Sequence, residues 1–130
     1  MNKTLDNYLN NSFICTKETK DKWKANNIKV IGDIHGDFGV LIQSLKKIKV
    51  INKNHRWKGG KTHIVQLGDI LDRGGRPGVT TEVSDPMEEY KIYEFLNDLD
   101  IQAEKHGGKV HYLLGNHELM NMMGDFRYVH

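Results

Sequence analysis

Three short polar motifs contain most of the residues in this chain that are suited to chemistry. They are GDIHG at residues 32–36, GDILDRG at residues 68–74 and GNHE at residues 115–118. Each motif places carboxylate, imidazole or amide groups next to glycines, which let the backbone approach a bound ion or phosphate closely. Because these side chains are metal ligands and phosphate binders, the motifs predict a metal-assisted phosphoester site.

The first two motifs supply a competent set of ligands for one metal ion. Asp33 and His35 are two residues apart, so they point the same way in an extended segment, and Asp69 follows the next strand. Two carboxylates and one imidazole suit Mn²⁺, Fe or Zn²⁺. Since a carboxylate can bridge, Asp69 is also able to reach a second ion together with the carbonyl of Asn116. Two ions about 3.5–4 Å apart activate a bridging water and clamp an in-line displacement at phosphorus.

The other motif residues suit the handling of a phosphate group. Arg73 offers a planar fork of donors that matches two phosphate oxygens, and Asn116 is expected to contact phosphate as well as metal. We expect His117 to protonate the leaving oxygen, with Asp72 holding its ring and keeping it charged. The alternative for Asp72 and Arg73 is a plain surface ion pair. Glu118 is predicted to be structural, bonding to backbone near its turn.

The composition is that of an ordinary globular domain. With 130 residues, of which 38% are hydrophobic and 28% charged, the chain can form one domain with a real core. A formal net charge of +2 gives little support to nucleic-acid binding. No apolar run has the length of a membrane span, and residues 1–6 lack the apolar core of a secretory signal. With Cys15 as the only cysteine, we expect a cytoplasmic protein without internal disulfides.

Three short apolar segments, each directly before a motif, are typical of β-strands. They cover residues 28–31, 62–67 and 110–114. Segments with helical spacing of apolar residues separate them, and a short helix is expected behind the third motif. This alternation predicts an α/β fold with right-handed crossovers and a mostly parallel sheet. All three motifs would then lie on the carboxyl edge of that sheet.

The two connecting helices have distinct apolar patterns. The first pattern is Val40, Leu41, Leu45 and Ile48. The second helix is expected to start at Asp85 as the N-cap, with Pro86 in the first turn and Glu88 in the capping-box position. Its apolar stripe is Ile92, Leu96, Leu99 and Ala103, and the glycines at 107–108 end it.

The three motifs resemble those of the calcineurin-like metallophosphoesterase superfamily. The phosphoprotein phosphatase branch has the patterns GDxHG, GDxxDRG and GNHE, and residues 32–36, 68–74 and 115–118 match them without departure. The continuation over residues 119–129 is most similar to the bacterial-like Shewanella-like phosphatases. The resemblance covers residue 28 to the end of the chain. Residues 28–130 are therefore interpreted as a partial domain of this family, and residues 1–27 as an N-terminal extension.

The resemblance implies a fold and a role for each matching residue. The family fold is a β-sandwich, a pair of packed sheets flanked by helices, of which this chain would supply mainly the first, parallel sheet. By resemblance, Asp33 and His35 bind the first of two divalent metals, Asp69 bridges both, Asn116 binds the second, Asp72 and His117 form the acid dyad, and Arg73 holds phosphate.

One departure from the family pattern lies after the third motif. The family takes two more histidine ligands for the second metal, and its second sheet, from strands well after GNHE. This sequence ends twelve residues past Glu118. We therefore expect the chain to be an N-terminal portion in which the second metal site is incomplete, with Asp69 and Asn116 alone, and the second sheet is largely missing.

The leading functional hypothesis is metal-dependent hydrolysis of phosphomonoesters by attack of a metal-bound hydroxide. The expected partner is a phosphoprotein carrying phosphoserine, phosphothreonine or phosphotyrosine, or else a small phosphoester. One alternative is a dinucleoside polyphosphate hydrolase, which shares these motifs. The other is an inactive, truncated fragment that binds metal or phosphate. The sequence leaves the native metal and the oligomeric state open.

Overall fold

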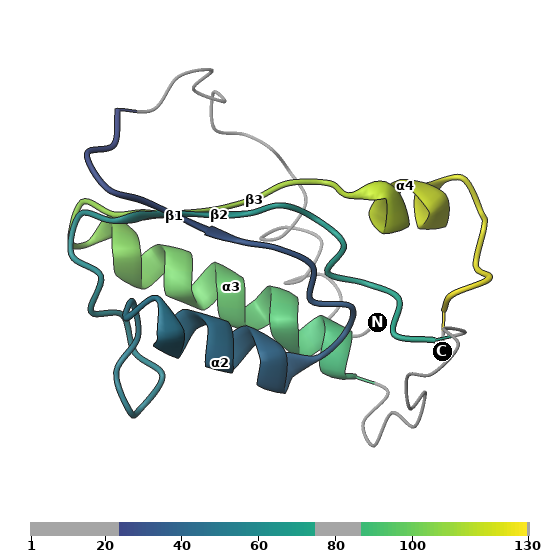
Figure 1. Cartoon of the computed structure of the whole chain (residues 1–130), viewed down its shortest axis with the longest axis horizontal. Helices are drawn as coiled ribbons and strands as arrows, with labels where there is room; N and C mark the ends of the chain where they lie inside the picture. Colours follow the sequence, from purple (N-terminus) through teal and green to yellow (C-terminus); the bar gives the residue numbers. More distant parts are fainter. Residues whose placement is uncertain (1–23, 75–86, 130) are drawn as a thin grey trace, which may run out of the picture.

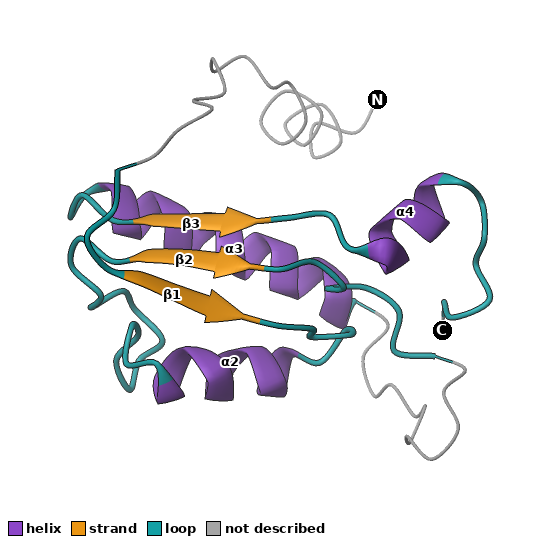
Figure 2. Cartoon of the chain, turned by 45° about the horizontal axis from the view of Figure 1, so that its top comes forward, coloured by secondary structure: helices purple, strands orange, loops and turns teal. Residues whose placement is uncertain are grey.

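The chain forms a three-stranded parallel sheet in a computed structural model that describes residues 24–74 and 87–129 (Figures 1 and 2). The strands are β1 (Ile28–Ile31), β2 (His63–Gln66) and β3 (Lys109–Tyr112), in the order β1-β2-β3. Their register pairs Ile28 with His63, and His63 with Lys109. The predicted parallel α/β sheet is confirmed, although β2 is shorter than expected and β3 begins and ends earlier.

Two helices cover one face of this sheet, and a third lies beyond its carboxyl end. Figure 1 shows α2 (Phe38–Lys47) and α3 (Glu88–Glu104) side by side beneath the strands, with α4 (Asn116–Met122) past the end of β3. A helix connects each parallel strand to the next, as a β-α-β crossover requires. The loops that leave the three strands therefore meet at one edge, where the three motifs lie.

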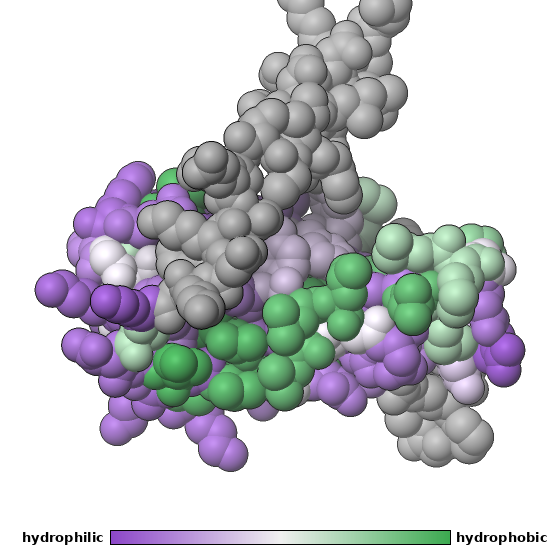
Figure 3. All heavy atoms as spheres, turned by 90° about the horizontal axis from the view of Figure 1, so that it is seen from above, coloured by the Kyte–Doolittle hydropathy of each residue, from purple (hydrophilic) through white to green (hydrophobic). Residues whose placement is uncertain are grey.

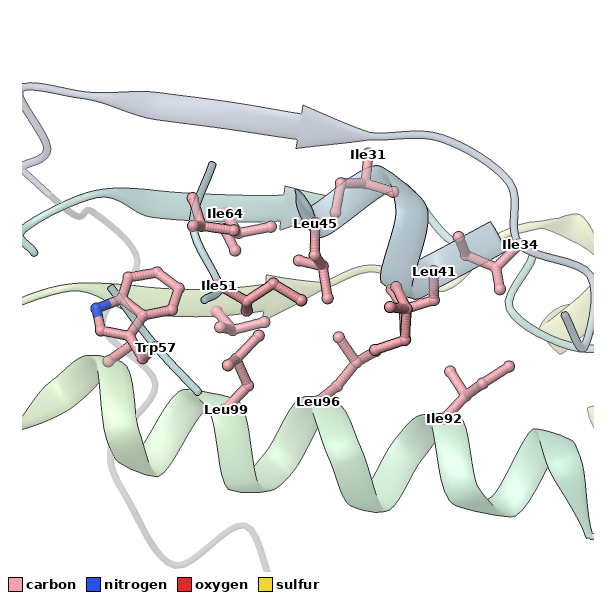
Figure 4. Close-up of a cluster of buried hydrophobic side chains, with 14 of the residues drawn as sticks. Ile31, Ile34, Leu41, Leu45, Ile51, Trp57, Ile64, Ile92, Leu96 and Leu99 are labelled. Atoms are coloured by element: carbon pink, nitrogen blue, oxygen red, sulfur yellow. The ribbon is translucent and has the colours of Figure 1, made fainter. Parts of the chain in front are cut away.

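The hydrophobic core lies between the sheet and helices α2 and α3. Figure 4 shows Leu41 and Leu45 of α2 facing Leu96 and Leu99 of α3, with Ile64 of β2 above them. All five are fully buried. Burying each such side chain stabilises the fold by about 1.5–3 kcal/mol. The apolar stripe predicted for the second helix is thus confirmed as its core face, since Ile92 and Ala103 are also fully buried.

Helix α3 begins differently from the sequence-based expectation. Its N-cap is Met87, which makes no side-chain cap, while the predicted cap Asp85 and Pro86 lie outside the described residues. Glu88 is the first helical residue, and its Oε1 accepts a hydrogen bond from the backbone N–H of Phe38 at 3.0 Å. Glu88 therefore caps the neighbouring helix α2 instead of forming a capping box in its own.

Helix α4 buries two polar residues and exposes several apolar ones. His117 and Glu118 are buried, whereas Leu119, Met122 and Met123 are 51%, 72% and 68% exposed. The expected short helix is present, but it begins inside the third motif, at Asn116. The helix therefore serves to place motif side chains at the sheet edge and contributes little to the core.

The sheet face opposite the helices carries exposed apolar side chains. Ile28 and Val30 of β1 are 57% and 55% exposed, and Leu67 and Leu113 after β2 and β3 are about half exposed, at 49% and 50%. Figure 3, which views this face, shows apolar residues gathered across it.

None of the described helices is both long and apolar enough to cross a membrane. Residues 1–23 of the predicted N-terminal extension lie outside the described residues.

Candidate metal and phosphate site

Backbone hydrogen bonds join the first two motifs directly. The N–H groups of Ile34 and His35 both donate to the carbonyl oxygen of Asp69, at 3.0 and 2.9 Å, and Gly36 N–H donates to Ile70 O at 2.6 Å. The carboxylate of Asp69 in turn accepts the N–H of His117 at 2.9 Å, which links the second motif to the third. The predicted convergence of the three motifs at one sheet edge is confirmed.

The hydrogen bond of His35 sets the tautomer of its ring. Its Nδ1 lies 3.1 Å from the carbonyl oxygen of Leu71. Because a carbonyl oxygen can only accept, Nδ1 carries the proton and Nε2 presents its lone pair. Nε2 lies 3.5 Å from Oδ2 of Asp33. An imidazole nitrogen held this way by a carbonyl on its other side is typical of metal-ligating histidines.

The side chains of His35, Asp69 and His117 form a compact cluster of possible metal ligands. One donor atom from each lies within 4.8 Å of the other two. The cluster differs from the predicted set of Asp33, His35 and Asp69, because it contains His117, while Asp33 lies beside it with Oδ2 3.5 Å from His35 Nε2. Such a mixed oxygen and nitrogen set fits a divalent transition metal. The donors of the cluster therefore fit the metal that the motifs predict.

His117 and Asp72 form a buried pair at the same edge. His117 Nδ1 lies 2.9 Å from Asp72 Oδ2, and the two residues are 5% and 1% exposed. Since the carboxylate accepts at Nδ1, the other ring nitrogen, Nε2, is the one that can transfer a proton to a bound group. The imidazole ring of His35 and the phenol ring of Tyr128 flank His117, with centroids 4.9 and 5.1 Å away. The pairing predicted between Asp72 and His117 is thus present.

Arg73 is held by two carboxylates next to this pair. Its Nη1 lies 3.1 Å from Glu88 Oε2, and its Nη2 lies 3.3 Å from Asp37 Oδ2. Asp37 is also the N-cap of α2, where its Oδ1 accepts the N–H of Val40 at 2.8 Å. Asp72 and Arg73 therefore take different partners, and the alternative of a plain surface ion pair between them is wrong. These partners fix the guanidinium at the rim of the site.

Glu118 organises the backbone of the second motif. Its two carboxylate oxygens accept N–H groups from Asp69, Ile70 and Leu71 at 2.8, 2.7 and 3.1 Å, and from Gly115 at 2.7 Å. The predicted structural role of Glu118 is confirmed, and it extends beyond its own turn to the loop after β2. Hydrogen bonds to a charged acceptor contribute about 1.5–3 kcal/mol each. One side chain thus holds the segment that carries Asp69.

Glu89 of α3 binds the next backbone N–H of the same loop, that of Asp72. Its Oε1 accepts the N–H of Asp72 at 2.8 Å. Burial raises the pKa of the Glu89 carboxyl above its usual value, and the nearby charges of Asp72 and Glu118 raise it further, against the lowering effect of the backbone N–H bonds. The N–H groups of residues 69–72 are therefore all held by two carboxylates, from α4 and α3.

Several site residues have a backbone conformation that side chains rarely adopt. His35, Asp69 and Asp72 have φ angles of 47°, 53° and 70°. Such left-handed residues cost energy unless their surroundings enforce them, and they cluster at functional sites. The carboxylate-held N–H groups described above supply this enforcement for Asp69 and Asp72. Three of the five described non-glycine residues with positive φ are thus motif residues, and the other two, Lys49 and His55, lie outside the motifs.

Glycine is required where the second and third motifs touch. Gly68 has a φ of +95°, and a Cβ there would overlap the backbone of Gly115. A Cβ on Gly115 would likewise overlap Asp69. The two loops can approach backbone to backbone only because both positions lack a side chain.

Two of the predicted site residues are at the exposed rim. The Asp33 side chain is 63% exposed. Asn116 is exposed at the first position of α4, directly before His117. Both positions are open to a bound group from outside.

Reasoning from sequence missed several supporting residues, among them Asp37, Gln66, Glu88, Glu89 and Asn121. Gln66 is fully buried at the end of β2, where its side chain bonds Gly32 O at 3.2 Å and both backbone groups of Gly68 at 2.7 and 2.8 Å. It therefore ties the first motif to the second. The sequence carried a signal for Glu88 and Glu89. They stand in the first turn of the helix that leads from β2 to β3, and that turn lies at the carboxyl edge of the sheet, near the motifs.

A comparison with known families accounts for this geometry. The calcineurin-like phosphoesterase family model matches residues 27–130. The chain belongs to the calcineurin-like phosphoesterase family. The resemblance found in the three motifs is thereby confirmed. Members of this family use divalent metals, and the cluster of His35, Asp69 and His117 is a candidate site for one.

Relatives place the chain more finely within the family. Over 106 residues it is 44% identical to Shewanella-like protein phosphatase 2 of Arabidopsis thaliana, which covers 82% of this chain and 24% of that protein. Over 128 residues it is 36% identical to Shewanella-like protein phosphatase 1 of Plasmodium berghei, covering 98% and 32%. The expected similarity to Shewanella-like phosphatases is confirmed.

A solved structure supports the same family placement. The cold-active protein tyrosine phosphatase of a psychrophilic Shewanella species matches with a TM-score of 0.67 and 38% identity, over 82% of this chain and 29% of that one. The α/β fold expected for the family is thus confirmed by a solved relative. The chain spans about a quarter to a third of the length of the relatives it matches.

Proposed function

We propose that this chain carries the metal-binding and proton-donating edge of a metal-dependent phosphatase. The observation that carries the proposal is the buried Asp72–His117 pair, 2.9 Å apart, next to the donor atoms of His35 and Asp69. A proton donor beside a metal site is what the displacement of a basic oxygen from phosphorus needs. Family membership and the named phosphatase relatives support the same reaction class.

The proposed ligands come from all three motifs. Asp33 and His35 would hold the first ion, Asp69 would bridge to the second, and Asn116 would hold the second. When bound, the two ions supply electrostatic stabilisation of the phosphoryl oxygens and an activated water. The Leu71 carbonyl fixes the His35 tautomer, and the Glu118 carboxylate fixes the backbone of Asp69, so the donors are preorganised.

The remaining residues would handle phosphate and proton. Arg73, held in position by Glu88 and Asp37, would offer its guanidinium to a phosphate at the rim, with Asn116 assisting. His117 would hold a proton at Nε2 and deliver it to the leaving oxygen, while Asp72 accepts at Nδ1 and stabilises the charged ring. The flanking ring of Tyr128 and the burial of the pair keep bulk water from His117.

The proposed substrate is a phosphoprotein. The relatives include proteins named as protein phosphatases, and one is a protein tyrosine phosphatase. The test compares phosphotyrosine, phosphoserine and phosphothreonine peptides with a dinucleoside polyphosphate, each with Mn²⁺, Fe²⁺ or Zn²⁺ added. Release of phosphate from a peptide with one of these metals is expected. Cleavage of the dinucleotide alone would replace the proposal with a dinucleoside polyphosphate hydrolase.

Metal binding gives a test that does not depend on turnover. Within this chain, the first ion has three proposed ligands and the second has two, Asp69 and Asn116. We therefore expect titration calorimetry with Mn²⁺ or Zn²⁺ to show one tight site and one weaker site. His35→Ala should remove the tight site, while His106→Ala, outside the motifs, should leave both unchanged. Two equally tight sites, or binding unaffected by His35→Ala, would contradict the assignment.

A cytoplasmic location remains a prediction from the sequence, in which Cys15 is the single cysteine.

A further inference from the structure

The side chain of Asn121 reaches the Asp72–His117 pair from the next turn of α4. Its Nδ2 lies 2.8 Å from Asp72 Oδ2 and 2.9 Å from the carbonyl oxygen of His117. Both neighbours can only accept, since one is a carboxylate oxygen and the other a carbonyl. The amide nitrogen must therefore face them, and it donates to both.

One oxygen of Asp72 consequently accepts two hydrogen bonds. His117 Nδ1 donates to Oδ2 from one side and Asn121 Nδ2 donates from the other, at 2.9 and 2.8 Å. His117 and Asn121 are four residues apart in α4, so they lie on the same face of the helix. The helix thus presents the ring and the amide to Asp72 as a rigid unit, within a pair that is almost completely buried.

We propose that Asn121 is a positioning residue that fixes the Asp72 carboxylate so that it holds the proton at His117 Nδ1. The ring then presents Nε2 to the leaving oxygen in one orientation. This inference rests on the proposed function, because it assigns Asn121 to the proton delivery of the same site. In this proposal Asn121 acts only through Asp72 and the backbone of His117, and it does not bind the phosphate or a metal ion.

The inference predicts an effect that depends on the leaving group. A basic alkoxide, as in phosphoserine, must receive a proton as it leaves, whereas p-nitrophenolate leaves without one. Asn121→Leu removes the second donor but keeps a side chain of similar size. We expect kcat on a phosphoserine peptide to fall about tenfold, the scale of one hydrogen bond to a charged group, and kcat on p-nitrophenyl phosphate to change less than about twofold.

A second variant separates the effect of the Asn121 hydrogen-bond donor from the effect of the side chain's shape. Asn121→Asp is isosteric but replaces the donor with an acceptor facing Asp72, so it should lower phosphoserine turnover at least as much as Asn121→Leu. Met122→Leu, on the exposed neighbouring position of the same helix, is the control and should match the wild type on both substrates. Thermal unfolding of each variant establishes that it is folded before rates are compared.

A spectroscopic measurement on the metal-free protein tests the geometry without turnover. In ¹⁵N-labelled wild type, His117 should give a single downfield Nδ1–H proton signal, which should broaden or split in Asn121→Leu and stay unchanged in Met122→Leu. Equal losses on both substrates, or an unchanged His117 spectrum in Asn121→Leu, would overturn the inference. Wild-type protein that hydrolyses neither substrate would overturn the proposed function, while the spectrum would still decide the positioning of His117.

Discussion

The helix-covered core and the carboxyl edge of the sheet are held together by different physics. Between the sheet and α2 and α3, fully buried side chains such as Leu45, Ile64 and Leu96 contact one another without polar partners (Figure 4). At the edge, the buried residues include Asp72, His117 and Glu118, and each has hydrogen-bond partners. The core gains stability from removing apolar surface from water, and the edge depends on satisfying every buried polar group.

This difference explains how the left-handed residues of the second motif are held in place. The left-handed Asp69 and Asp72 are at the edge, where carboxylates of Glu118 and Glu89 hold their backbone N–H groups. An apolar layer cannot impose such a conformation, because its contacts have no direction. The core therefore contributes stability through apolar burial, while the hydrogen bonds of the edge hold the left-handed residues and the site side chains in place.

The largest expected effect is on catalysis and comes from the edge alone. His117→Asn removes the proposed proton donor, so kcat on a phosphopeptide should fall about 10²- to 10⁴-fold. Metal content, measured by atomic emission, should be unchanged, because His117 is proposed as an acid and not as a ligand. A rate equal to that of the wild type would remove His117 from the mechanism. Loss of metal would instead assign His117 to the ligand cluster with His35 and Asp69.

The core should respond in the opposite way. Leu96→Ala opens a cavity beneath the sheet and should lower the free energy of unfolding by about 2–5 kcal/mol, measured by urea denaturation. The rate per folded molecule should stay at the wild-type value. Ile101→Ala, on the exposed side of α3, is the control and should change stability by less than about 0.5 kcal/mol. A Leu96→Ala protein with unchanged stability but a lower rate would contradict the assignment of stability to the core and catalysis to the edge.

Glu118→Gln should change both properties, because Glu118 belongs structurally to the edge. The amide keeps one acceptor oxygen, so some of the four N–H groups bonded to Glu118 lose their partner. We expect a loss of about 1–3 kcal/mol in the free energy of unfolding, together with weaker metal binding through Asp69. Glu94→Gln, on the exposed face of α3, should be neutral. Unchanged metal affinity in Glu118→Gln would show that the loop holds Asp69 without it.

The smallest effect is a dependence of stability on pH at Glu89. Because burial raises its pKa in the folded protein, the folded state binds this proton at higher pH than the unfolded chain does. Stability contributed by Glu89 therefore increases as the pH falls through the raised pKa and is absent above it. Glu89→Gln keeps an acceptor for the Asp72 N–H but removes the titration. The difference in unfolding free energy between wild type and variant should shift in favour of the wild type on acidification, and a shift in the other direction would contradict the assignment.

The sequence alone determined the sheet, its helices and the edge at which the chemistry gathers. The apolar segments at 28–31, 62–67 and 110–114 predicted parallel strands, and the stripe through Leu96 and Leu99 predicted the core face of α3. These features are local, because periodicity along the chain fixes which face of an element is apolar. The order of strands and helices then placed all three motifs on one edge.

Apart from the Asp72–His117 pair, which the motifs predicted, only the tertiary structure decided which polar groups meet at that edge. Glu88 and Asn121 are 15 and 49 residues from the side chains they hold, Arg73 and Asp72. No spacing in the sequence specifies such a pair, because a hydrogen bond requires donor and acceptor from separate elements to be placed to within a few tenths of an ångström. Glu88, predicted at the capping-box position of its own helix, instead accepts the N–H of Phe38 in the first turn of α2. Apolar burial tolerates small displacements and can be predicted from a pattern, whereas directional bonds require the folded coordinates.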